Sequence, residues 1–231
     1  NLVLEYPVDQ FHRFNLYTDF TYLERDYLVN RSYSYVNSAH LSFVKDNALW
    51  GISGPMDGAR YKLSIGYSQD FVNQNISYTT ILLDARKYFR TSPQTTFAVR
   101  GLYLTNTGDG AKVQYMGGSW DLVGYPFRSI AGYNFILLAN EFRFPLMDFF
   151  GFKFASGPAI GSNGIRGTIF GHIGNGYRDE IQLDQMKGSF GTGIRMNLFG
   201  AFVLRWDFGW RTDFNSVERN TFTQFFFGWD Y

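Results

Sequence analysis

The feature that most constrains this chain is the regular alternation of apolar and polar side chains near its C-terminus. From Phe202 to Asp213, one parity begins with Phe202, Leu204, Trp206, Phe208 and Trp210. After Val203, the other parity reads Arg205, Asp207, Gly209, Arg211 and Asp213. Because successive side chains of a β-strand point to opposite faces, this segment would have one apolar face and one mostly charged face. The pattern predicts a strand that separates an apolar environment from a polar one.

Other segments repeat this alternation. One lies before the first, with Phe190, Ile194, Met196 and Leu198 set against Ser189, Gly191, Gly193, Arg195 and Asn197. Another sets Tyr61, Leu63, Ile65 and Tyr67 against Arg60, Lys62, Ser64, Gly66 and Ser68. The last segment carries Phe225, Phe227, Trp229 and Tyr231 on one parity, and Phe226 is the exception on the other. We predict that the aromatic parity of each segment faces lipid.

About ten strands follow from this reading, and each has roughly the length that a tilted membrane-spanning strand needs. The expected ranges are 13–25, 32–46, 59–71, 77–90, 95–105, 133–146, 165–174, 188–198, 201–213 and 221–231. Nothing approaches the roughly 18 consecutive apolar residues of a spanning helix. The fold class that we predict is all-β, an antiparallel transmembrane β-barrel over residues 1–231 or the C-terminal part of a larger one, with residues 1–10 as a lead-in segment.

The connections between these segments differ sharply in length. Tight turns are indicated by Gly-Pro-Met-Asp-Gly at residues 54–58, by Ser92 and Pro93, and by residues 197–200. Residues 106–132 and 175–187 form long connections. Outer-membrane barrels have short turns at one rim and long loops at the other. The alternative is a soluble β-sandwich, whose strands also alternate. The Trp, Phe and Tyr near the strand ends favour the barrel, because interfacial aromatic girdles sit there.

Composition excludes several classes of partner and site. The 21 basic and 20 acidic residues nearly balance, so no basic field for nucleic acid is expected. There is no cysteine, which leaves no disulfide framework and no thiolate metal site. The first residue is Asn1 and no signal peptide is visible, so we take the chain as mature or truncated.

The polar residues give little reason to expect an enzyme or a cofactor. The histidines are His12, His40 and His172, and they are too dispersed to indicate a metal site. His40 shares the polar parity with Ser38 and Ser42, as Asp84 does with Arg86 and Glu141 with Arg143. We interpret these residues as a polar network inside the barrel and expect no catalytic, metal or cofactor site. The Gly-rich stretch of residues 108–118 lacks the Lys-Ser/Thr phrase of a phosphate loop, and its glycines suit tight turns.

Two phrases resemble the bacterial surface antigen family of BamA-like outer-membrane assembly and translocation barrels. The first runs Gly117-Gly118-Ser-Trp-Asp-Leu122-Val123-Gly124-Tyr125-Pro-Phe, and the second runs Asn140-Glu141-Phe142-Arg143-Phe144-Pro145-Leu146. As in that family, five strands are expected after the loop. A third phrase, in residues 46–61, resembles a branch whose barrel follows a TolB-like propeller. The resemblance implies that residues 106–132 fold into the lumen, with Gly117, Gly118, Leu122, Val123, Gly124 and Tyr125 as the loop motif.

The chain departs from the family at the residues that brace this loop. The family's loop arginine falls at Val123, and the aspartate of its partner strand falls at His172. A neutral pair is physically sensible, since one buried charge without its partner would be expensive. His172 is therefore the expected docking partner of the loop, and Arg128 is a weaker candidate for a substitute cation.

The function that the resemblance implies is insertion or assembly of outer-membrane polypeptides, or their translocation, at a weak seam between the first and last strands. The expected partners are the lipid bilayer, unfolded outer-membrane or secreted polypeptides, and assembly machinery that reads the C-terminal strand. That strand ends on an aromatic, so Phe225, Phe227, Trp229 and Tyr231 resemble the family's assembly signal. The alternative is a non-catalytic membrane anchor or passive pore that displays an upstream soluble domain. Both place the chain in a bacterial outer membrane.

Overall fold

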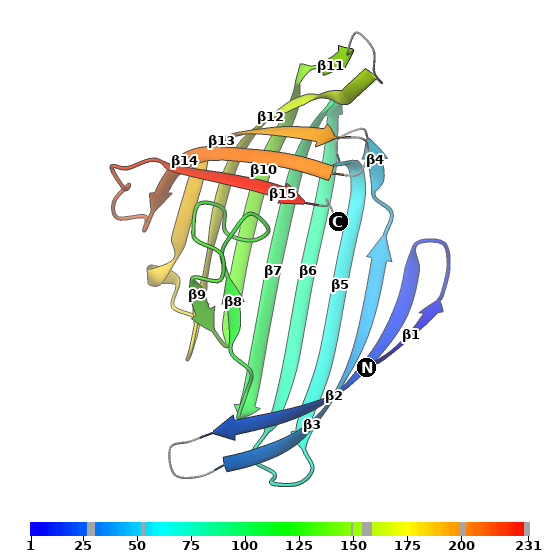
Figure 1. The fold of residues 1–231 in the computed structure, drawn as a ribbon, viewed down its shortest axis with the longest axis vertical. Coiled ribbons are helices and arrows are strands. Elements are labelled where there is room, and N and C mark those ends of the chain that lie inside the picture. The colour runs from blue at the N-terminus through cyan, green and yellow to red at the C-terminus, as the bar shows by residue number, and fades with distance from the viewer. Residues whose placement is uncertain (27–30, 52–53, 149, 154–158, 199–201, 229–231) are drawn as a thin grey trace.

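The fold is dominated by one large curved antiparallel sheet (Figure 1). The structure is a computed structural model, and it describes residues 1–26, 31–51, 54–148, 150–153, 159–198 and 202–228. The main path of the sheet runs β1-β2-β3-β5-β6-β7-β10-β12-β13-β14-β15, and the short strands β4 and β11 pair beside it with β5 and β12. Its strands are β1 Leu2–Pro7, β2 His12–Asp26, β3 Arg31–Asp46, β4 Leu49–Gly51, β5 Gly54–Asp70, β6 Ser77–Ser92, β7 Thr95–Asp109, β10 Asn134–Met147, β11 Phe150–Lys153, β12 Ala159–Tyr177, β13 Lys187–Leu198, β14 Phe202–Thr212 and β15 Phe222–Gly228.

The ten predicted strands are confirmed, with differences at their ends. β5 begins at Gly54 and β12 at Ala159, each five or six residues before the predicted start, and β7 continues to Asp109. Residue 201 and residues 229–231, predicted within the last two strands, lie outside the described residues. Residues 1–10, expected as a lead-in, contain β1, which pairs with β2 from Leu2 opposite Thr18 to Pro7 opposite Arg13. The side chains of β1 are exposed on both parities, so no alternation marked it in the sequence.

The two faces of the sheet carry the predicted parities. On β14, Trp206 and Trp210 are 47% and 40% exposed, whereas Asp207 between them is fully buried. On β5, Tyr61, Leu63, Ile65 and Tyr67 are exposed, and Ser64 and Ser68 are buried. The apolar side chains therefore point away from the protein and the polar side chains point into it. A soluble sandwich would bury the apolar face between two sheets, so that alternative is wrong.

The ends of the sheet stay apart. β1 and β15 are the terminal strands of its path, and no pairing between them is found among the described residues. Within the same residues, no helix is long and apolar enough to cross a membrane.

The outward position of Trp206, near the middle of β14, gives a first test. Trp206→Arg should lower the free energy of unfolding in phospholipid vesicles by about 2–4 kcal/mol, the cost of a guanidinium near the bilayer midplane. Val72→Arg is the control, because Val72 is also exposed but lies in the connection after β5, where a surface change should stay within about 0.5 kcal/mol. Equal small effects in urea titrations would contradict a lipid-facing Trp206.

Candidate functional site

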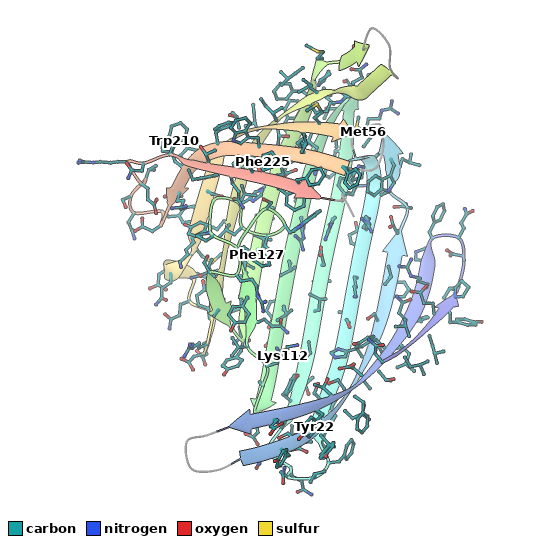
Figure 2. The ribbon with its side chains drawn as sticks, viewed as in Figure 1. Tyr22, Met56, Lys112, Phe127, Trp210 and Phe225 are labelled. Atoms are coloured by element: carbon teal, nitrogen blue, oxygen red, sulfur yellow. The ribbon has the colours of Figure 1, made fainter. Side chains whose placement is uncertain are left out.

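The candidate site is the segment between β7 and β10, together with the strands that it contacts. This segment, residues 110–133, is called here the inner loop. Its short strands β8 Gln114–Met116 and β9 Ile130–Gly132 pair with each other as a small hairpin. The segment returns over the polar face of the sheet, within its curve (Figure 1). Figure 2 shows Phe127 near its tip, in front of the sheet.

Two apolar contacts anchor the inner loop. Leu122 packs in a buried cluster with Met116 and Ile130 of the hairpin and with Phe135 and Leu137 of β10. Its neighbour Val123 belongs to a second buried cluster with Phe170 of β12 and Phe222 of β15. Leu122 and Val123 have no exposed surface. Complete burial of two aliphatic side chains from a loop is a substantial apolar contribution, of about 1.5–3 kcal/mol each.

The wall also binds the backbone of the inner loop. Arg205 Nη1 donates to Ser119 O at 3.1 Å, and Arg100 Nη1 donates to Trp120 O at 2.6 Å. Arg211 Nε donates to Gly124 O at 2.5 Å. The Gly124 amide donates to Gln224 Oε1 of β15 at 2.6 Å. Cations on two strands, β7 and β14, and an amide on a third, β15, thus fix the loop through peptide groups, which any loop sequence would present.

Tyr125 and Gly124 pack closely against the wall, next to the hydrogen bonds that Gly124 makes. The Tyr125 hydroxyl donates to Gly188 O of β13 at 3.2 Å, and the Arg211 guanidinium lies 5.6 Å from the Tyr125 ring centroid. Gly124 has φ +91°, and a Cβ on it would lie 2.5 Å from the Phe222 ring. Glycine is required there for its backbone conformation and for the close approach of the aromatic ring.

Beneath the inner loop, one carboxylate holds three arginines. Glu141 of β10 accepts from Arg195 Nη1 and Nη2 at 2.8 and 2.7 Å, and from Arg143 Nη2 at 2.7 Å. Arg205 Nη2 donates to the same carboxylate at 3.2 Å. Arg195 and Arg205 are direct register partners on β13 and β14, an arrangement in which like charges repel. Glu141 and Asp207, which accepts from Arg205 Nε at 2.5 Å, offset that repulsion.

A second network lies on β6 and β7. Asp84 accepts from Arg86 Nη2 and from Arg100 Nη2, both at 2.9 Å. Arg100 also lies 3.7 Å from Asp121 of the inner loop. Burial raises the pKa of the Asp121 carboxyl above its ordinary value, and the charge of Arg100 opposes that rise. The predicted polar interior is therefore a set of shared ion pairs rather than separate residues.

The predicted loop partners do not form one direct pair. His172 is buried on β12, with its ring 5.3 Å from that of Phe170 and its Nε2 3.8 Å from Glu141 Oε1. Val123 contacts the apolar cluster that includes Phe170, so the two residues are placed near one another through this ring. Arg128 is exposed and stacks 4.6 Å from the centroid of Tyr115, which gives it a role within the hairpin rather than at His172.

The other predicted site residues are spread over the sheet. Phe225 and Phe227 are exposed on the outer face of β15, and Phe226, the exception in the alternation, packs edge-on against Trp120 of the inner loop at 4.9 Å. Trp229 and Tyr231 lie outside the described residues. His12 contacts Asp9 in the β1–β2 turn, and His40 lies beside Tyr17. In the described part of the chain, no three His, Asp or Glu residues gather as a metal site would need.

Sequence reasoning missed the residues that hold the loop backbone. Arg205, Arg211 and Gln224 lie on polar parities, so their inward direction was readable from the alternation. Arg100 shares its parity with Ala98, Leu102 and Leu104, so the alternation gave no such signal for it. Which carbonyl each one reaches depends on strand register and loop path, and neither has a sequence signal.

Comparison with known proteins supports the fold. No family model and no curated protein matches the sequence. Among solved structures, the chain is similar to BamA from Haemophilus ducreyi, crystallised without its POTRA domains 1–3, with a TM-score of 0.71 and 15% sequence identity. The match covers 97% of this chain and 53% of that one, so the chain spans about half of the length of that protein. The fold is that of the BamA β-barrel.

Gly124 provides a test of the docked loop. Gly124→Ala should weaken docking, since the added methyl meets Phe222 and the left-handed backbone is strained, at a cost of about 1–3 kcal/mol. Amide hydrogen exchange of residues 117–129 should become faster. Gly101→Ala is the matched control, because a Cβ there meets nothing within 4 Å. Unchanged protection in both variants would argue against a loop held at Gly124.

Glu141 provides a separate test of the network. Glu141→Gln should destabilise the refolded barrel by about 3–5 kcal/mol, because it leaves buried guanidiniums without their shared carboxylate. Glu5→Gln, which removes an exposed partner 3.9 Å from Arg13, should cost about 0–1 kcal/mol. Urea midpoints in detergent micelles measure both, and a shift for Glu141→Gln no larger than that for Glu5→Gln would contradict this role.

Proposed function

We propose that this chain is an integral barrel of a bacterial outer membrane that assists the insertion or assembly of other polypeptides, or their translocation. The observation that carries the proposal is the inner loop docked on the wall of an open BamA-type barrel. It contacts β12 and β15 through Val123 and β15 again through Gln224, beside one free edge of the sheet.

The proposed mechanism uses no covalent chemistry. The edges of β1 and β15 carry backbone groups that an incoming strand can pair with, as exposed edge strands do. The inner loop braces the β15 side, so that an edge can open to a client strand while the rest of the wall keeps its shape. The apolar outer face keeps the chain in the bilayer.

A second proposal is a passive anchor or pore for an upstream soluble domain, such as the TolB-like propeller that precedes the barrel in the branch that residues 46–61 resemble. The cavities and ion pairs of the inner face favour neither function. The two functions differ in their effect on other proteins, because an anchor or pore is not expected to speed the folding of another barrel.

The decisive experiment follows a client. The full chain is reconstituted in phospholipid vesicles, and the folding of a small unfolded outer-membrane protein is followed by its heat-modifiable gel mobility. An assembly function predicts faster client folding than in empty vesicles, and a smaller gain with the loop variant Gly124→Ala than with Gly101→Ala. Equal rates in loaded and empty vesicles would overturn the proposal and leave the anchor or pore.

The C-terminal aromatics carry a further prediction. Tyr231→Ala should reduce the folded fraction in outer membranes strongly, because this aromatic is proposed to be part of the signal that is read during assembly. After refolding in detergent, the same change should cost at most the burial of one side chain, about 1.5–3 kcal/mol. Comparable small effects in membranes and in urea titrations would mean that Tyr231 is one more lipid-facing residue.

A further inference from the structure

A cavity lined by arginines lies between the inner loop and the wall. Its volume is about 100 Å³. A water molecule takes about 30 Å³ in the liquid, so the space suits about three waters or one small ion. It is bounded on the loop side by Ser119, Trp120 and Asp121. Six guanidiniums line it: Arg60, Arg86, Arg100, Arg143, Arg195 and Arg205.

Strand register forces these cations together. Arg60 of β5 is the register partner of Arg86 on β6, and Arg86 is the partner of Arg100 on β7. Arg195 and Arg205 are likewise opposite one another on β13 and β14. Like charges directly opposite in a sheet destabilise it. Two rows of like charges therefore converge on one small space.

Carboxylates around the cavity pair with these guanidiniums. Among the ion pairs of the described residues, Asp46 meets Arg60, Asp84 meets Arg86 and Arg100, and Asp121 meets Arg100. Glu141 meets Arg143, Arg195 and Arg205, and Asp207 meets Arg205. Six guanidiniums and five carboxylates thus take part in these pairs. A guanidinium carries five N–H donors and a carboxylate only two acceptor oxygens, so the cluster is richer in donors than in acceptor oxygens.

A buried histidine at the cavity is a further group that lacks an acceptor. His172 lines the cavity and its side chain is only 3% exposed. Neither of its ring nitrogens has a hydrogen-bond partner among the described residues. Its distance of 3.8 Å to Glu141 Oε1 is beyond hydrogen-bond reach. Buried polar groups in proteins nearly always have a partner, so a ligand acceptor for an imidazole N–H is expected here.

We propose that this cavity binds a small tetrahedral oxyanion, phosphate or sulfate, which enters from the aqueous interior of the barrel. Guanidinium groups match such an anion well, because their planar N–H forks bind two oxygens at once. His172 supplies a further donor. Arg100 and Arg205 also donate to Trp120 O and Ser119 O, so the bound anion would hold the wall and the inner loop in one network. The inference does not depend on the proposed assembly function.

Calorimetric titration tests it. The refolded full chain in detergent micelles is titrated with sodium phosphate, with sodium chloride holding the ionic strength constant. One saturable site per chain is expected in the wild type. Arg86→Gln and His172→Phe should each weaken binding at least tenfold, and neither residue donates to the inner loop. Arg178→Gln, a change beyond β12 and outside the cavity lining, should bind like the wild type.

The contrary outcomes are distinct. No saturable heat with the wild type would overturn the proposal. So would equal binding by all four proteins, which would place phosphate elsewhere on the surface. If Arg86→Gln or His172→Phe fails to show the heat-modifiable mobility of a folded barrel, the proposal is tested on the wild type alone. Its urea midpoint should then rise with phosphate at constant ionic strength and reach a plateau, and an unchanged midpoint would refute the site.

Discussion

The carboxylate of Glu141 is the interaction on which the interior of this barrel most depends. It lies on β10 and binds guanidiniums from β10, β13 and β14, so it ties strands that are two and three positions apart in the sheet. Without it, Arg195 and Arg205 would face one another across a strand pair with less opposite charge beside them. Since Arg205 also donates to Ser119 O, the same carboxylate indirectly sets the position of the inner loop.

The cations that hold the inner loop lie on the wall of the barrel and not on the loop. Val123, the position at which the sequence resemblance would place a loop arginine, is buried with Phe170 and Phe222. The cations instead belong to the wall, where Arg100, Arg205 and Arg211 donate to loop carbonyls. The docking energy then comes mainly from apolar burial and from peptide groups, and the one ion pair described between the loop and the wall joins Asp121 to Arg100.

The alternation of side chains was enough to predict ten of the strands. A membrane barrel repeats this one simple pattern in the strands that span the bilayer. The faces were predicted as well: Trp206 and Trp210 point out and Asp207 points in. β1 was missed because its side chains are exposed on both parities. The contacts of the inner loop were predicted only in outline. Val123 and His172 were expected as partners, whereas Phe170 lies between their environments, and the role of Arg211 at Gly124 depends on a register that alternation does not encode.

The central claim is that one face of this sheet contacts lipid while the other encloses polar groups and the inner loop. The chain has no cysteine, so single-cysteine variants across residues 61–68 of β5 can be spin-labelled without further changes. In phospholipid vesicles, collision with oxygen should be high at positions 61, 63, 65 and 67 and low at the positions between them. Collision rates without this two-residue period, or with the opposite phase, would contradict the account.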